Sequence, residues 1–163
     1  MQKPLTIGIA GLGTVGAGLV RLISTHFDDL AIRADRSIEI TAVSARDRNA
    51  DRGVDISSFE WHDDPLALAR ADGVDVVVEL IGGSDGVAKA LCETAFENGK
   101  HVVTANKALI AHHGTALARA AEKAGVSLSY EAAVAGGIPI IKSLRGGLAG
   151  NGLSRVYGIL NGT

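Results

Sequence analysis

The chain carries a run of glycines whose spacing is suited to holding a phosphate group. They form a G-x-G-x-x-G pattern directly after an apolar run, Leu5 to Ala10, and at the start of a helical pattern. The first glycine then makes a tight turn, the second lets the backbone approach a pyrophosphate, and the third lets helix and strand pack closely. The amides of the helix N-terminus face the anion. A glycine-rich turn with no ligand is the alternative. The residues that we expect to bind the dinucleotide are Gly11, Leu12, Gly13, Thr14, Val15 and Gly16.

The residues after the second predicted strand are expected to determine which of the two nicotinamide dinucleotides, NAD or NADP, is bound. An acidic residue in this place binds the ribose 2′-hydroxyl of NAD, whereas an arginine accommodates the 2′-phosphate of NADP. The sequence is Ala45-Arg46-Asp47-Arg48, in which Arg46 is the first arginine after the strand. The arginines favour NADP as the cofactor, while Asp47 leaves NAD open. The alternative is that all three are solvated loop charges.

Lys107 is a candidate catalytic residue. It follows a short predicted strand, His101 to Thr104, at the edge where ligands collect in open parallel sheets. A lysine there could donate to a carbonyl oxygen or to a substrate carboxylate and stabilise developing charge. The alternative is a surface lysine at the start of a helix, which is the usual place for lysine.

Glu131 is a candidate ligand for a hard cation. It ends a predicted strand, and the segment Ala132 to Gly137 has no other charged side chain, so backbone carbonyls there could join the carboxylate around the ion. A set of oxygen ligands without cysteine or histidine argues against zinc. The alternative is that Glu131 caps the next helix and Pro139 starts it.

Strands and helices alternate along the chain and must position these residues. Short apolar runs predict strands over Leu5–Ala10, Ser37–Ser44, Val74–Leu80, His101–Thr104, Val126–Tyr130 and Leu153–Leu160. Helical spacing predicts helices over Thr14–Phe27, Asp85–Asn98, Ala108–Ala124 and Ile138–Leu148. The charged stretch Asp28–Arg36 is expected to be a surface excursion. This alternation predicts an α/β fold with a doubly wound parallel sheet, the Rossmann dinucleotide-binding architecture.

Composition places the chain among ordinary globular proteins of about one domain's length. It has 163 residues, 47% hydrophobic and 21% charged, and a formal charge of −2. No basic cluster is present, so nucleic acid is not an expected partner, and no apolar run is long enough to predict a membrane span. The single cysteine, Cys92, excludes an internal disulfide and is expected to be a buried apolar residue and not a nucleophile. With no leader-like start, we expect a cytoplasmic protein.

Several segments together resemble the homoserine dehydrogenase family, enzymes that interconvert aspartate 4-semialdehyde and homoserine. The resemblance covers nearly the whole chain, and its most specific parts are Thr-Ala-Asn-Lys and Glu-Ala-Ala-Val-Ala-Gly-Gly-Ile-Pro. The segments that carry it are Gly8–Gly16, Glu79–Gly83, Gly99–Lys107, Tyr130–Ile140 and Gly158–Thr163.

The resemblance implies roles for individual residues. It places Lys107 beside the nicotinamide as a catalytic residue, and with Gly82 and Thr104 among the residues that bind the cofactor. It also implies a sodium-type structural site. The implied sodium ligands are Glu131 and the backbone of Val134, Gly136 and Ile138.

The resemblance also implies a longer enzyme, because the family's substrate-binding and dimer-forming region lies beyond the end of this sequence. We expect residues 1–150 to be the dinucleotide-binding domain and residues 151–163, with a first strand, to begin the substrate and dimerisation region. The expected partners are a small-molecule substrate and, in the full-length enzyme, a second copy in a homodimer. This chain alone is expected to be inactive. Two alternatives stay open: a non-catalytic dinucleotide-binding sensor or regulatory module, and the dehydrogenase half of a fusion with aspartate kinase.

Overall fold

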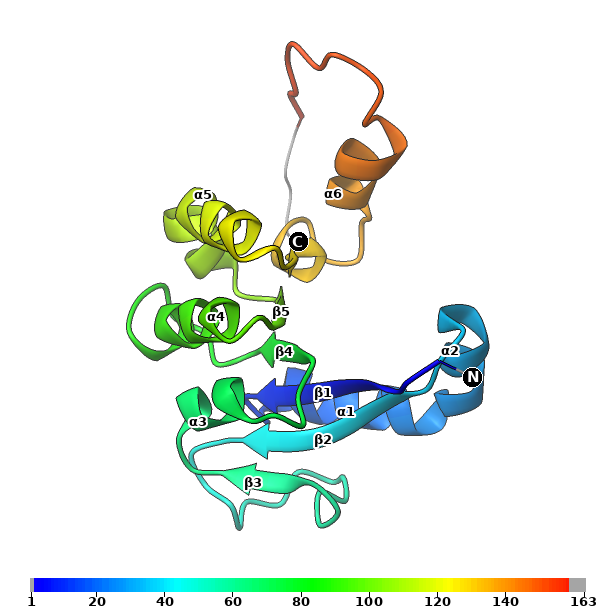
Figure 1. Ribbon diagram of the computed structural model, residues 1–163, viewed down its shortest axis with the longest axis vertical. Coiled ribbons are helices and arrows are strands. Elements are labelled where there is room, and N and C mark those ends of the chain that lie inside the picture. The colour runs from blue at the N-terminus through cyan, green and yellow to red at the C-terminus, as the bar shows by residue number, and fades with distance from the viewer. Residues whose placement is uncertain (1, 159–163) are drawn as a thin grey trace.

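The computed structural model describes residues 2–158, which contain a six-stranded parallel sheet in the order β3-β2-β1-β4-β5-β6 (Figure 1). The strands are β1 (Leu5–Ala10), β2 (Ile38–Ser44), β3 (Glu60–His62), β4 (Val76–Glu79), β5 (His101–Thr104) and β6 (Leu128–Ser129). The helices are α1 (Thr14–Thr25), α2 (Phe27–Ala34), α3 (Pro65–Arg70), α4 (Val87–Glu97), α5 (Lys107–Ala124) and α6 (Ile140–Lys142). The strand order reverses at β1, which pairs with both β2 and β4. The predicted doubly wound fold is confirmed.

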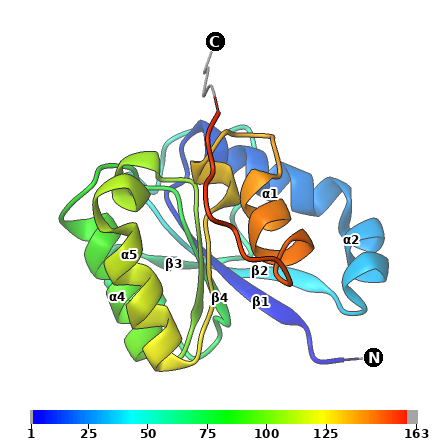
Figure 2. The same ribbon diagram turned by 90° about the horizontal axis from the view of Figure 1, so that it is seen from above.

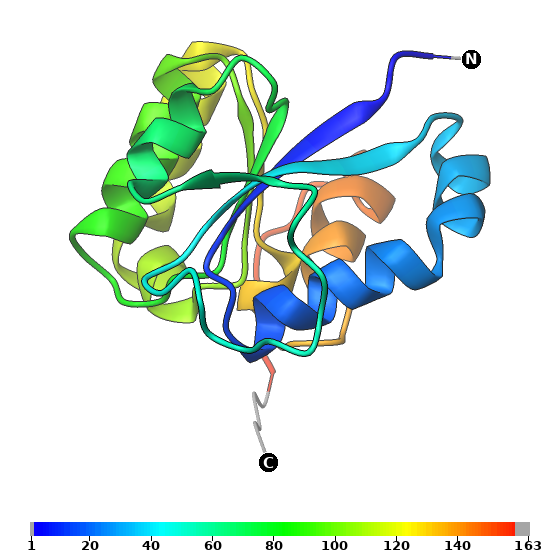
Figure 3. The same cartoon turned by 90° about the horizontal axis from the view of Figure 1, so that it is seen from below.

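Helices cover both faces of the sheet. Figure 2 shows α4 and α5 on one face and α1 and α2 on the other, and Figure 3 shows the same division from the opposite side, with α3 beside α4. Each face has its own buried apolar cluster. Leu68, Leu91 and Leu109 belong to the cluster under α3, α4 and α5, whereas Val20 and Ile23 of α1 pack in the other cluster. The β-branched run of β4 is buried throughout because both of its faces are covered.

The polar stretch Asp28–Arg36 lies on the surface, as predicted, but most of it forms a helix, which the sequence did not predict. α2 occupies Phe27–Ala34 with acidic residues in its first turn and Arg33 in its last, an arrangement that suits the helix dipole. Leu30 packs against the cluster under α1 and gives the helix its attachment to the sheet. The charges therefore lie on the solvent side of an amphipathic helix, which a reading by charge alone misses.

The C-terminal part differs most from expectation. The helix expected over 138–148 is a single turn, α6, followed by a π-helical turn over Ser143–Gly147 that contains two glycines. The strand expected over 153–160 is not formed in residues 153–158, and residues 159–160 lie outside the described residues. None of the six sheet strands pairs with this segment, and a strand without a neighbour has no ladder to form.

Cys92 lies in the larger core cluster with no exposed surface, as predicted. Burial raises the pKa of its thiol to about 12, and the charge of Glu79 adds to the effect. The thiol is therefore protonated at neutral pH, which fits an inert core residue. In residues 2–158, no helix combines the length and apolar character needed to cross a bilayer.

Candidate functional site

A pocket of about 690 Å³ opens at the carboxyl edge of the sheet. Because all six strands are parallel, the loops that follow β1, β2 and β4 meet there. Of the predicted cofactor-binding residues, five line the pocket: Gly11, Leu12, Gly13, Arg46 and Gly82. The predicted glycine turn, the arginine after β2 and the loop after β4 are thus brought together at one site, at the point where the strand order reverses.

The glycine turn needs glycine for reasons visible in its backbone. Gly11 has a φ of 104°, and a Cβ atom there would lie 2.5 Å from the carbonyl oxygen of Leu80. A Cβ atom on Gly16 would overlap the carbonyl oxygen of Gly11, so this glycine lets α1 pack against the turn. At both positions a Cβ atom would clash with the protein's own backbone, so only glycine allows this shape of the turn.

Gly13 differs from Gly11 and Gly16 because, apart from Gly13 itself and the two adjacent residues, no protein atom lies within 4 Å of the place where its Cβ atom would be. It is the N-cap of α1, has no side chain to cap the helix, and is followed by a first turn without acidic residues. Amides at the start of α1 are therefore left for an external acceptor. An open space before an uncapped helix N-terminus suits a pyrophosphate group.

The loop after β2 carries three arginines, two of which line the pocket: Arg46 and Arg52. The guanidinium groups of Arg48 and Arg52 lie 5.9 and 5.8 Å from the ring centre of Trp61, and Arg48 does not line the pocket. Asp47 also lines the pocket, but one of its carboxylate oxygens accepts a 2.8 Å hydrogen bond from the amide of Asn49. One oxygen of the Asp47 carboxylate is thus engaged in its own turn, and both Asp47 and Arg46 are exposed residues at the cleft.

Sequence reasoning missed Arg52. Its guanidinium donates to the carbonyl oxygens of Asp47 and Ala50, the latter at 2.7 Å, and so fixes the loop that carries Arg46. Its Nε atom is buried without a hydrogen-bond partner in the described chain. No local sequence pattern indicates that Arg52 also lines the pocket.

The loops after β4 and β5 form the other side of the site. The amide of Gly82 donates to the Glu79 carboxylate at 3.2 Å, so Gly82 meets the pocket through its other backbone atoms. Thr104 is fully buried and its hydroxyl also donates to Glu79. Lys107 is exposed as the first residue of α5, directly after Asn106, whose side chain caps that helix. Cofactor contacts of Thr104 and Lys107 stay predictions.

Asp85 links the β4 loop to α5. It lines the pocket, and its carboxylate lies 2.8 Å from Nε2 of His113. Hydrogen bonds from the Ser84 hydroxyl and from His113 hold the pKa of Asp85 below its ordinary value. An ionised carboxylate therefore borders the cleft beside the loop after β4.

Glu131 caps a helix, which is one of the two readings that the sequence left open. Its carboxylate oxygens accept hydrogen bonds from the amides of Ile141 and Lys142 at 3.1 and 2.8 Å, and Pro139 stands at the N-cap of α6. In residues 2–158 no three histidine, cysteine, aspartate or glutamate side chains gather as a metal-binding group. A cation held mainly by carbonyl oxygens is a different arrangement and stays a prediction.

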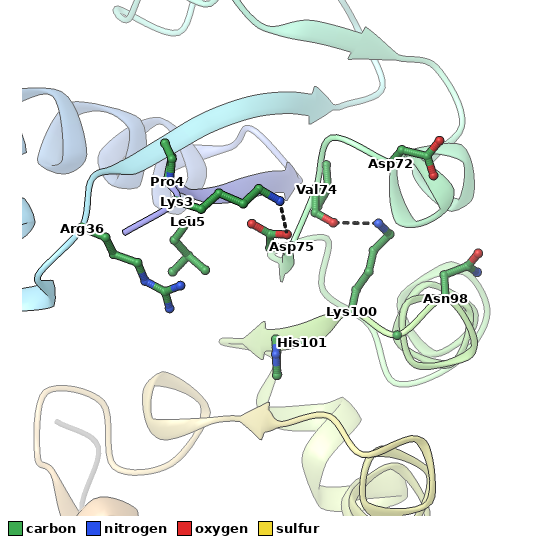
Figure 4. A pocket seen from close by; sticks show the side chains of 11 residues that line it. Lys3, Pro4, Leu5, Arg36, Asp72, Val74, Asp75, Asn98, Lys100 and His101 are labelled. Atoms are coloured by element: carbon green, nitrogen blue, oxygen red, sulfur yellow. Dashed lines mark hydrogen bonds and ion pairs between the residues drawn. The ribbon is translucent and has the colours of Figure 1, made fainter. Parts of the chain in front are cut away.

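A second hollow of about 500 Å³ lies at the opposite, amino edge of the sheet, and Figure 4 shows its charged lining. The ammonium group of Lys100 donates to the carbonyl oxygens of Ala71 and Val74, both at 2.7 Å. Lys3 pairs with Asp75 at 3.8 Å, and Asp75 also accepts bonds from Thr6. Main-chain carbonyls and neighbouring charges satisfy these groups, and none of the predicted site residues lies here.

The doubly wound sheet, the glycine turn and the pocket at its reversal point define a dinucleotide-binding domain. A family model described as "Homoserine dehydrogenase, NAD binding domain" matches residues 11–131. The chain belongs to the homoserine dehydrogenase family and corresponds to its NAD-binding portion.

Individual relatives support the same family assignment. The chain is 46% identical to a homoserine dehydrogenase of Neisseria gonorrhoeae and 47% identical to one of Pseudomonas aeruginosa, each over 99% of this chain and 37% of the relative. A crystal structure of a homoserine dehydrogenase from Thiobacillus denitrificans matches with a TM-score of 0.83 and 41% identity over 91% of this chain and 34% of that one. The chain thus spans about a third of the length of these proteins.

Proposed function

We propose that this chain is the cofactor-binding part of an NADP-dependent homoserine dehydrogenase, with NAD as the weaker ligand. The observation that carries the proposal is the cleft in which the glycine turn and Arg46 meet. The uncapped start of α1 holds the pyrophosphate, and Arg46 holds the 2′-phosphate of the adenosine half. Because adenosine lies on the β2 side of β1, the nicotinamide half extends toward the loops after β4 and β5.

When bound, the dinucleotide supplies hydride exchange with the substrate carbon. The protein's own task is to orient it and to stabilise charge at the substrate oxygen. Lys107, exposed at the start of α5, supplies that positive charge. The rest of the enzyme supplies the substrate site and the dimer contacts, so this chain alone binds cofactor without oxidising homoserine.

A sodium-type structural cation is a further part of the proposal. Its ligands are the Glu131 carboxylate and the carbonyls of Val134, Gly136 and Ile138. Each carboxylate oxygen accepts one hydrogen bond and keeps a second lone pair for an ion. Ala135 and Gly137 have φ values of 52° and 81°, and these turns set the direction of the neighbouring carbonyls. All four ligands are oxygens, as a hard cation prefers.

The choice between the two dinucleotides can be tested by replacing the arginine at the cleft. Arg46→Ala removes a charge-assisted contact and is expected to weaken NADPH binding by about 10- to 100-fold. NADH has no 2′-phosphate, so its affinity should stay within about twofold. The measurement is a calorimetric titration of each variant with both dinucleotides.

Arg48→Ala is the matched control, because Arg48 belongs to the same loop and does not line the pocket. This variant should bind NADPH as the unmodified chain does. Equal loss of NADPH and NADH affinity in Arg46→Ala, or no loss of either, would show that Arg46 does not read the 2′-phosphate.

A further inference from the structure

Glu79 is a fully buried carboxylate at the carboxyl end of β4. One oxygen accepts hydrogen bonds from the amides of Ile81 and Gly82, at 2.8 and 3.2 Å. The other accepts a 2.5 Å hydrogen bond from the hydroxyl of Thr104 at the end of β5. The pairing register sets Glu79 directly beside Thr104. A single side chain therefore joins the loop after β4 to the end of β5.

The connection continues to the start of α5. The Thr104 hydroxyl oxygen accepts the amide of Asn106 at 3.0 Å. The Asn106 side chain in turn accepts the amide of Leu109, which caps α5, and donates to the carbonyl oxygen of Gly83 at 2.6 Å. This chain of bonds runs from Glu79 to the residue just before Lys107 and returns to the β4 loop.

Burying a carboxylate costs free energy unless hydrogen bonds within the protein replace those that it makes with water. Here two main-chain amides and a hydroxyl provide that compensation. Leu80, Ile81 and Gly82 line the cofactor pocket, whereas Glu79 itself does not reach it. Gly82 and Gly83 both have a φ of 83°, so the loop adopts a conformation that few residues favour and that bonds to Glu79 hold in place.

We propose that Glu79 is a positioning residue that holds the β4 loop and the start of α5 in one fixed arrangement for the nicotinamide half of the dinucleotide. The proposal rests on the proposed function, since it assumes that these loops receive the nicotinamide. Glu79 acts through Gly82, Thr104 and Asn106 and does not touch the cofactor. Its effect should be confined to one half of the ligand.

The experiment compares two ligands that differ only in that half: NADPH and 2′-phospho-ADP-ribose, which lacks the nicotinamide. Glu79→Ala is expected to weaken NADPH binding about tenfold, because the loops lose their common anchor. Affinity for 2′-phospho-ADP-ribose should stay within about twofold. The fluorescence of bound NADPH, which reports the immobilisation of the reduced nicotinamide ring, should fall toward that of free NADPH.

Two further variants separate positioning from general support of the fold. Glu79→Gln keeps an acceptor for the two amides and can donate to the Thr104 oxygen, so most NADPH affinity should be retained. Thr104→Val keeps the shape but cuts the connection to Asn106, so a selective but smaller loss for NADPH is expected. Should Glu79→Ala not fold, Thr104→Val must still show this selective loss.

Equal weakening of both ligands in a folded variant would overturn the proposal, since it would show a structural role only. Unchanged NADPH affinity in Glu79→Ala, or in Thr104→Val where the alanine variant does not fold, would overturn it as well. Failure of the proposed function looks different: the unmodified chain would then bind neither NADPH nor 2′-phospho-ADP-ribose.

Discussion

Lys107 stands at the first position of α5 with its side chain exposed. Its location depends on Asn106, whose side chain accepts the amide of Leu109 and so fixes where the helix begins. The asparagine also reaches across to the β4 loop through Gly83. Among residues 2–158 no acidic side chain forms an ion pair with Lys107, so the helix start alone sets its position there.

Replacing this lysine tests the proposed catalytic role at the scale of one residue. In the full-length enzyme that carries this domain, Lys107→Met should lower kcat for homoserine about 100-fold, because a charge that stabilises the reacting oxygen is lost. Lys123→Met, in the last turn of the same helix, is the control and should leave kcat unchanged. Steady-state kinetics makes the comparison, and normal turnover by Lys107→Met would exclude the role.

At the scale of elements, the β1–turn–α1 unit carries the cofactor site. Its three glycines are needed for different reasons, which the sequence pattern alone does not distinguish. Gly11 and Gly16 are required by contacts inside the protein, whereas Gly13 faces open space. Gly13 also has a φ of −74°, which other residues adopt without strain.

This division predicts two kinds of glycine variant. Gly13→Ala should fold with a loss of at most about 1 kcal/mol, yet its methyl group should occupy the pyrophosphate space and weaken NADPH binding at least about tenfold. Gly16→Ala should lower the free energy of unfolding by about 1–3 kcal/mol, because its methyl group overlaps Gly11. Urea unfolding and NADPH titration measure both. A Gly13→Ala chain that binds NADPH normally would contradict this account of the turn.

Most of the sheet could be predicted because its signals are local. The apolar runs gave β1, β2, β4, β5 and β6 to within a few residues, and the glycine pattern placed the turn before α1. β3 and α3 were both missed. β3, Glu60–His62, is too short to show a periodic pattern. The Asp64–Pro65 pair did offer a signal, since Asp64 caps α3 and Pro65 occupies its first turn.

The site was predicted less completely than the fold. Gly11, Gly13 and Arg46 could be found because each belongs to a pattern within a few residues. Glu79 could not be given a role, because its partner Thr104 lies 25 positions away and meets it only through the pairing of β4 with β5. Properties that depend on strand register are not contained in a local pattern.

At the scale of the whole molecule, the two edges of the sheet differ in character. The carboxyl edge carries the open cleft with its glycine turn, while the amino edge carries charges that satisfy one another and the main chain. The chain spans about a third of the length of its relatives, and the part it covers is the part that binds the dinucleotide. We therefore propose that the cleft binds a nicotinamide dinucleotide and favours the phosphorylated form.

A calorimetric titration of the unmodified chain with NADPH and, separately, with NADH tests this proposal. We expect one saturable site per chain for NADPH, with an affinity about tenfold or more above that for NADH, because of the proposed contact between Arg46 and the 2′-phosphate. A folded chain that binds neither dinucleotide would contradict the assignment of the cleft, and tighter binding of NADH would contradict the role of Arg46.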